Sequence, residues 1–239
     1  MKRFYKETGV GAGEGGWQVL LDGRPMRTPA KAILTVPTQA LAQAIAAEWQ
    51  AVPEQVEINV AHLPLTRLAA TGLDRVTSQR AQVIDDTAKY AASDLLCYRA
   101  TDPETLVKRQ ADLWQPLLDW AAERYGARLA VGSGASFVTQ PSEALSALRS
   151  AVAAHSDLAL SALYNLTHIA GSVVIALAVA EGRLPAADAY AAAQLDELFQ
   201  IERWGEDALA AQRLAGVRND IDACARFLAL LEDKRLGGQ

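Results

Sequence analysis

Cysteines, aromatic residues and clusters of basic side chains are scarce in this chain of 239 residues. It has two cysteines, Cys97 and Cys224, and no CxxC or HxxxH spacing, so we expect reduced core thiols and no metal site. Basic residues form only the short clusters Lys2-Arg3 and Lys234-Arg235, and the formal net charge is −5. Because phosphate binding requires a basic surface, this charge distribution argues against a nucleic-acid partner.

Sequence signals for nucleotide or acyl chemistry are also missing. No GxxxxGK[ST] loop and no GxSxG elbow occurs in the chain. Residues 11–16 formally match GxGxxG, but they precede the apparent strand 17–21 instead of following a strand and opening a helix. We therefore interpret these glycines as a flexible hairpin loop and expect no cofactor and no catalytic residue.

The first third of the chain has the patterns of a small α+β unit. Trp17, Val19 and Leu21 alternate with other residues, and Asp22-Gly23 is a hairpin signal. Further strands are predicted at 24–28, 32–36 and 56–60. Thr38 is the expected N-cap of a helix that presents an apolar face. That face consists of Leu41, Ala42, Ile45 and Trp49.

From Leu65 onward the apolar period becomes helical. We predict a helix capped by Asp102 that ends at Gly126, and one opened by Pro185 that continues through the acidic stretch near residue 200. The last predicted helix has an apolar stripe at Val217, Ile221, Cys224, Leu228 and Leu231. The predicted fold class is α+β, with a strand-rich α+β domain at 1–68 and a larger all-helical bundle at 69–239.

One uncharged stretch, Leu158–Ala180, is long enough to cross a bilayer. It contains polar residues such as Asn165 and His168 and lacks aromatic belts and basic flanks. We expect it to form a helix buried in the bundle, with no stable membrane insertion. A membrane-associated assembly factor that uses this stretch is the alternative.

The most informative stretch is Asp196–Asp207, DELFQIERWGED, which has five acids and one base. On a helix, Leu195, Leu198 and Ile201 share one face. Glu197, Gln200 and Trp204 share another, because residues three, four and seven apart are neighbours. Aromatic residues on a surface are often contact groups, so this face is a candidate partner-binding site. The alternative is that Trp204 is buried against a second apolar patch.

Motifs along nearly the whole chain resemble one family, the ATP synthase assembly chaperones that act on the alpha subunit. DE-x-x-Q-x-x-x-WGED is similar to the family's C-terminal motif. The other similar segments, in the family's order, are RFYK at 3–6, LDGRPMRTP at 21–29, VPT-x-x-LA-x-x-IA-x-EW at 36–49, HLPLTRLA at 62–69, YAASDLLCYRA at 90–100 and GS at 171–172. The family usually has methionine where this chain has His62.

The resemblance implies an ATP-independent chaperone that binds the free alpha subunit and prevents its aggregation until the beta subunit replaces it. Glu197, Gln200 and Trp204 would then lie at or near the contact. An acid there would set specificity more than affinity. The competing interpretation of Glu197 is an internal ion pair with an arginine that only supports the fold.

An enzyme with a cryptic site near His168 or the acidic motif is the second hypothesis, and it predicts a deep pocket there. The histidine itself is more typical of a hydrogen-bonded core residue. The N-terminal segment resembles neither a secretory signal nor a presequence, so we expect the bacterial cytoplasm, or the mitochondrial matrix for a mature eukaryotic chain. The sequence does not predict the oligomeric state.

Overall fold

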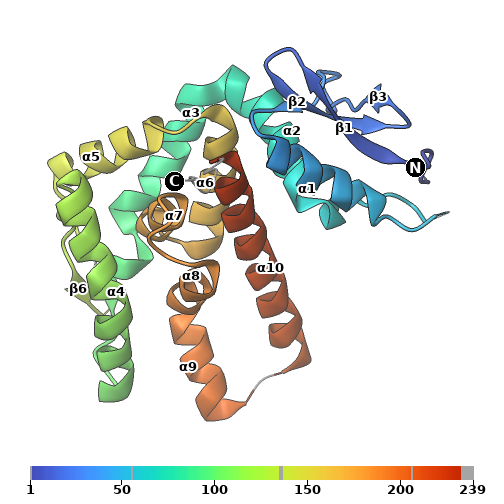
Figure 1. Ribbon diagram of the computed structural model, residues 1–239. Helices are drawn as coiled ribbons and strands as arrows, with labels where there is room; N and C mark the ends of the chain where they lie inside the picture. Colours follow the sequence, from blue (N-terminus) through green and yellow to red (C-terminus); the bar gives the residue numbers. More distant parts are fainter. Residues whose placement is uncertain (1, 55, 135–136, 206, 233–239) are drawn as a thin grey trace, which may run out of the picture. The chain divides into compact units, whose positions relative to one another are not determined.

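The computed structural model describes residues 2–54, 56–134, 137–205 and 207–232. The chain forms two compact units, shown with their elements labelled in Figure 1. Unit 1 comprises Met1–Arg80, Ser156–Ala162 and Arg226–Gln239, and unit 2 comprises Ala81–His155 and Leu163–Ala225. The predicted α+β class is confirmed, since strands gather near the N-terminus and helices form most of the rest. The domain boundary between residues 68 and 69 stays a prediction.

Unit 1 contains a small sheet built around β2 (Gly16–Leu21). This strand pairs antiparallel with β1 (Thr8–Gly13), β3 (Arg24–Pro25) and β4 (Thr35–Val36). Asp22 and Gly23 both have positive φ, at 48° and 75°, as the predicted hairpin turn requires. The interpretation of residues 11–16 as a loop was wrong, because pairing with β2 holds most of them in strands despite the low strand preference of glycine.

The helix α1 (Gln39–Gln50) begins where the sequence predicts it. The Thr38 side chain accepts a hydrogen bond from Leu41 N, and the predicted apolar face is buried. Near the end of α1, Glu48 accepts hydrogen bonds from the backbone N–H groups of Leu65 (2.7 Å) and Thr66 (2.9 Å). These residues open α2 (Pro64–Thr71), so a carboxylate of one helix satisfies the free N–H groups of the next.

A strand at 56–60 was a wrong prediction. Glu57 forms only an isolated bridge with Lys2, and a short 3-10 helix, η1 (Val60–His62), occupies the end of the segment. His62 is exposed there. Alternating apolar residues form a strand only where a partner strand is available, and in the described residues this segment has a single bridge.

The rest of unit 1 depends on a close approach between helices. A π-helical turn, η2 (Gly72–Val76), connects α2 to α3 (Thr77–Ala88). A Cβ atom added to Gly72 would lie 2.8 Å from the side chain of Leu158, near the start of α6 (Asp157–Ala170). The hydroxyl of Ser161 donates to Leu68 O at 2.9 Å, and Arg80 pairs with Asp157. Glycine at position 72 therefore permits the backbones to pack closely.

Unit 2 is helical around a short buried helix, α7 (Val173–Ala180), all of whose residues are buried. It packs against α4 (Glu104–Tyr125), α5 (Ser142–Ala153) and α8 (Ala186–Ala193). The short helices η3 (Lys89–Ser93) and η4 (Leu95–Cys97) precede α4, and β5 (Tyr98–Arg99) pairs parallel with β6 (Gly132–Ser133). The remaining elements are α9 (Leu195–Trp204) and α10 (Ala208–Leu231).

Three helix predictions for this part of the chain need correction. The stretch 158–180 forms two helices, because Gly171 adopts φ 65° between α6 and α7. The helix expected from Pro185 is likewise divided, at Gln194, into α8 and α9. Pro103, not Asp102, is the N-cap of α4, and no side chain caps that helix. Gly126 ends α4 in the left-handed conformation as predicted.

The end of the chain follows its apolar pattern. Ile221, Cys224 and Leu228 of the predicted stripe on α10 are buried. Cys97 and Cys224 are free and buried, which confirms them as core thiols. Among the described helices, none is both long and apolar enough to cross a membrane.

Candidate functional site

The acidic motif forms α9, an amphipathic helix of unit 2. Leu195 and Phe199 are buried, whereas Gln200 and Trp204 are exposed. Figure 1 shows that α9 ends and α10 begins at the same end of unit 2. We call this end, with the exposed residues of both helices next to the turn, the hairpin tip.

Phe199 attaches α9 to the body of unit 2. Its ring lies between two guanidinium groups, with Arg203 at 4.7 Å and Arg109 of α4 at 5.3 Å from the ring centroid. Arg109 also donates to Glu202 at 2.7 Å, across from α4 to α9. Both members of that ion pair are about half exposed, so we assign the stability of the attachment mainly to Phe199.

The first turn of α9 is fixed by a second contact with α4. Gln110 is buried. Its side-chain Nε2 donates to the Asp196 carboxylate at 2.7 Å, and its side-chain Oε1 accepts from Ala100 N at 2.8 Å. Trp114 lies one turn further along α4 and donates to Ala192 O of α8 at 2.9 Å. These contacts fix α8 and α9 against α4, so α4 holds the exposed face of α9 in a defined position.

Glu197 has an internal partner. Its carboxylate forms an ion pair with Arg213 of α10, which raises the pKa of the Arg213 guanidinium. The Glu197 side chain remains 30% exposed. The contact is the internal arginine pair considered as the alternative role of Glu197, and it leaves part of the side chain exposed.

The hairpin tip exposes two large apolar side chains. Trp204 is 76% exposed and Leu209 is 79% exposed. The alternative in which Trp204 is buried was therefore wrong. Gly205 has φ 87° and ends α9, and the Asp207 carboxylate caps α10 by accepting from the N–H groups of Leu209 and Ala210. The turn thus has defined caps on both sides of residue 206, which lies outside the described residues.

Leu209 is a candidate contact residue that the sequence patterns did not reveal. The apolar stripe of α10 was recognised only from Val217 onward, where burial repeats with helical spacing. Leu209 lies outside that stripe, and a single leucine off the stripe of a long helix is common on protein surfaces. Its 79% exposure in the first turn of α10, just after the end of α9 at Trp204, is what makes it a candidate.

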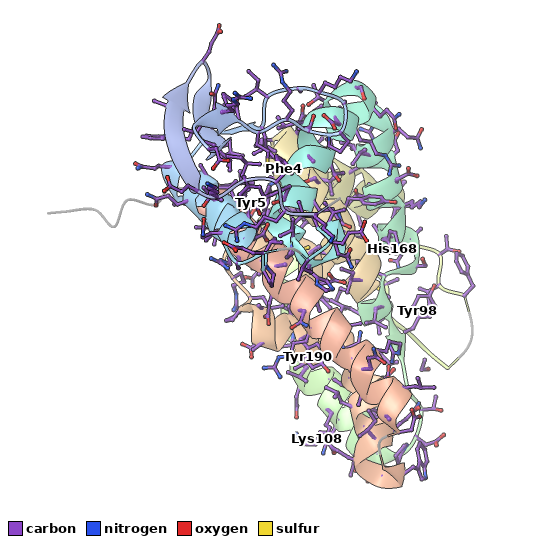
Figure 2. The ribbon with its side chains drawn as sticks, turned by 90° about the vertical axis from the view of Figure 1, so that its right-hand side faces the viewer. Phe4, Tyr5, Tyr98, Lys108, His168 and Tyr190 are labelled. Atoms are coloured by element: carbon purple, nitrogen blue, oxygen red, sulfur yellow. The ribbon has the colours of Figure 1, made fainter. Side chains whose placement is uncertain are left out.

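His168 is exposed, so the expectation of a core histidine was wrong, although the expected hydrogen bond is present. Its Nδ1 atom lies 2.6 Å from the Tyr90 hydroxyl, and its ring stacks on Tyr164 with centroids 6.5 Å apart. Figure 2 shows the labelled His168 side chain on the surface. Three cavities of about 600 to 750 Å³ in the described chain are lined only by residues between Phe4 and Arg75. None of these cavities supports an enzyme site at His168 or the acidic motif.

Two further sequence motifs meet in the interior of unit 2. Asp94, from YAASDLLCYRA, is fully buried and accepts hydrogen bonds from Leu96 N (3.1 Å), Val174 N (3.2 Å) and the side chain of Ser172. Ser172, from the GS pair, also accepts from Ile175 N at 3.0 Å as the N-cap of α7. Burial raises the pKa of Asp94 to about 6, while the hydrogen bonds oppose this rise. The two motifs therefore cap α7.

Comparisons with known proteins agree with this architecture. The family model described as ATP12 chaperone protein matches residues 2–122. The crystal structure of Atp12 from Paracoccus denitrificans is similar, with a TM-score of 0.89, 43% identity, and coverage of 97% of this chain and 98% of that one. The crystal structure of the Atu1473 protein from Agrobacterium tumefaciens gives a TM-score of 0.91 and 42% identity over 97% of this chain and 86% of that one.

A more distant relative extends the comparison to a eukaryote. The mitochondrial protein atp12 of Schizosaccharomyces pombe is 26% identical over 225 residues, which cover 87% of this chain and 75% of the relative. The family model spans just over half of the chain, and the solved structures cover nearly all of it at more than 40% identity. On these grounds the chain belongs to the ATP12 chaperone family.

Proposed function

We propose that this chain is an ATP-independent assembly chaperone of the ATP synthase that binds the free alpha subunit. It holds that subunit in a stoichiometric complex until the beta subunit takes its place. The observation that carries the proposal is the exposure of two large apolar side chains at the hairpin tip, Trp204 within the family-like motif and Leu209 just after it. Exposed tryptophans are characteristic of binding hot spots.

The contact surface that we propose includes Glu197, Gln200 and Trp204 of α9, together with Leu209 of α10. Trp204 and Leu209 would supply apolar contact, and Gln200 would supply hydrogen bonds at the rim. The partly exposed Glu197 side chain would select for a partner with a positive charge at the matching position. A stable complex requires an interface of roughly 1,200–2,000 Å², so the partner must extend beyond the tip.

The site of action follows from the proposed client. The alpha subunit must be held where it first exists without its neighbours. If the chain is bacterial, like the relative from Paracoccus denitrificans, we propose that it acts in the cytoplasm. If it is the mature form of a eukaryotic protein, like the relative named mitochondrial, we propose the mitochondrial matrix.

Size-exclusion chromatography with freshly refolded alpha subunit tests the proposal. We expect co-elution with alpha, loss of the complex when beta is added, and at least tenfold weaker binding for Trp204→Ala with Leu209→Ala. Phe137→Ala is the matched control, because Phe137 is another aromatic residue of unit 2 with 73% exposure and lies outside α9 and α10. If alpha aggregates equally with and without the chaperone, the proposed function is wrong.

A charge swap separates the two roles of Glu197. Glu197→Lys breaks the pair with Arg213, and adding Arg213→Glu restores an ion pair of opposite polarity. If Glu197 contacts alpha, binding falls in the single variant and stays low in the double variant. Recovery of binding in the double variant would show that Glu197 only supports the fold.

A further inference from the structure

A groove in unit 1 has the features of a second binding surface. Cavities of about 600 and 750 Å³ adjoin there, because Met26, Arg27 and Trp49 line both of them. We call the combined depression the arginine groove. Its buried lining includes Met26, Leu34 and Trp49, and its edges include Phe4 and Val60, which are 60% and 55% exposed.

The apolar lining of the arginine groove is rigidly held. The indole Nε1 of Trp49 donates to the Thr66 hydroxyl at 2.9 Å, and the Tyr5 hydroxyl donates to Trp49 O at 2.6 Å. Figure 2 labels Phe4 and Tyr5, which are consecutive, and the exposed Phe4 ring packs edge-on against that of Tyr5 at 5.4 Å. The aromatic lining is thus fixed before any ligand arrives, which lowers the entropy cost of binding.

Positive side chains outnumber negative ones around the groove. Four arginines line it, Arg24, Arg27, Arg67 and Arg75, against two acids, Asp22 and Asp74. This local excess of positive charge occurs in a chain whose net charge is −5.

Both acids of the groove are already engaged within unit 1. Asp22 accepts from the backbone N–H groups of Lys6 and Glu7, which lowers its pKa and keeps it ionised. Asp74 accepts from the Thr28 hydroxyl at 2.6 Å and from Ala30 N at 3.0 Å. Both acids therefore serve the local fold but keep their negative charge, so four arginines against two carboxylates leave the groove with an excess of two positive charges.

We propose that the arginine groove binds an extended polypeptide segment in which apolar side chains alternate with Asp or Glu. The apolar side chains lie against Met26 and Trp49, and the carboxylates pair with the guanidinium groups, whose planar donors fit carboxylates. A small anion would leave Phe4 and Val60 uncovered, whereas a peptide covers both. The inference rests on the proposed function only in naming the free alpha subunit as the source of the segment.

Fluorescence anisotropy of the full chain with labelled dodecapeptides tests the proposal. The first peptide alternates Leu with Glu, the second replaces Glu with Lys, and the third replaces Leu with Ser. We expect measurable binding of the first peptide alone, weakened by salt as carboxylate–arginine contacts are screened. Equal binding of the Leu/Glu and Leu/Lys peptides would overturn the charge assignment.

Paired variants locate the site. Arg24→Glu with Arg27→Glu should weaken binding of the Leu/Glu peptide at least tenfold. Lys108→Glu with Arg128→Glu makes the same charge change in unit 2 and should leave binding unchanged. If circular dichroism shows that the groove variant is misfolded, the milder pair Arg24→Gln with Arg27→Gln replaces it. We then expect the affinity for the Leu/Glu peptide to fall at least threefold. Identical loss in both Glu pairs would refute the groove as the site.

Competition identifies the source of the segment. Unlabelled alpha subunit should displace the Leu/Glu peptide, and the Trp204→Ala variant should retain its affinity for the peptide. If alpha co-elutes with the chaperone but never displaces the peptide, the assignment of alpha as the source of the segment is wrong, while the proposed function stands. If no complex with alpha forms at all, the proposed function fails, and peptide binding that depends on Arg24 and Arg27 still supports the groove.

Discussion

Replacement of Asp94 by asparagine should change how stability depends on pH. Asp94 is fully buried and accepts hydrogen bonds from Leu96 N and Val174 N at the start of α7. Its pKa is about 6 in the folded protein and 3.8 as an ordinary aspartate. The folded state therefore holds the proton more tightly than the unfolded state, and asparagine cannot titrate.

The sign and size of the effect follow from these two pKa values. Because the folded value is the higher one, the stabilising contribution is complete below pH 3.8 and is lost as the pH rises through 6. The full difference of about two pKa units corresponds to about 3 kcal/mol. Between pH 7.5 and pH 5, the wild type should gain between about 1 and 2 kcal/mol relative to Asp94→Asn.

Urea unfolding followed by circular dichroism at pH 5, 6 and 7.5 measures this difference. All other titrating groups are common to both proteins, so subtracting the two free energies of unfolding isolates the contribution of Asp94. A difference that stays constant with pH would refute the raised pKa. A difference that favours the wild type more at pH 7.5 would mean that the hydrogen bonds to the carboxylate outweigh its burial.

Three further substitutions test the packing by their melting temperatures. Glu48→Gln should cost about 1–3 kcal/mol, because an amide offers one acceptor where the start of α2 presents two backbone donors, and at 2–4 °C per kcal/mol the melting temperature should fall by several degrees. Gly72→Ala should cost a similar amount, since the new methyl group would overlap Leu158, and an unchanged melting temperature would show that α6 can shift. Trp114→Phe removes the hydrogen bond to Ala192 O and should cost about 1–2 kcal/mol, whereas a neutral result would mean that water replaces the indole.

Local signals in the sequence predicted much of unit 1. Thr38 was identified as an N-cap because its hydroxyl can satisfy a free N–H group of the next turn, and the contact with Leu41 N confirms it. Asp22-Gly23 predicted a tight hairpin because both positions tolerate positive φ. Such signals act within a few residues, so a sequence pattern can identify them.

Breaks inside apolar helices could not be predicted in the same way. Gly171 separates α6 from α7, but residues 158–180 contain no charged side chain on either side of it, which suggested one helix. The division depends on Asp94, which is 80 residues from Val174 and supplies the acceptor for its N–H group. An acceptor so distant in sequence is visible only after folding.

The candidate site was predicted only in part, because some of its contacts join residues on different helices. Helical spacing placed Glu197, Gln200 and Trp204 on one face of α9, and the helix is present. Their role in binding the partner stays a prediction. The pairing of Glu197 with Arg213 and the exposure of Leu209 depend on how α10 follows α9 in space. Periodicity within one helix carries no information about that arrangement.

The capping of α7 by Asp94 and Ser172 bears on how relatives of this chaperone can be compared. Two of the segments that resemble motifs of the family supply hydrogen-bond acceptors to buried backbone N–H groups within unit 2. Proteins that share these motifs share the same buried scaffold. The motifs therefore say little about which client each protein binds. Under the proposed contact surface, client choice would diverge at exposed positions such as Leu209 while these buried motifs stay the same. Chimaeras that exchange only the hairpin tip between relatives should then keep the fold and exchange the client preference.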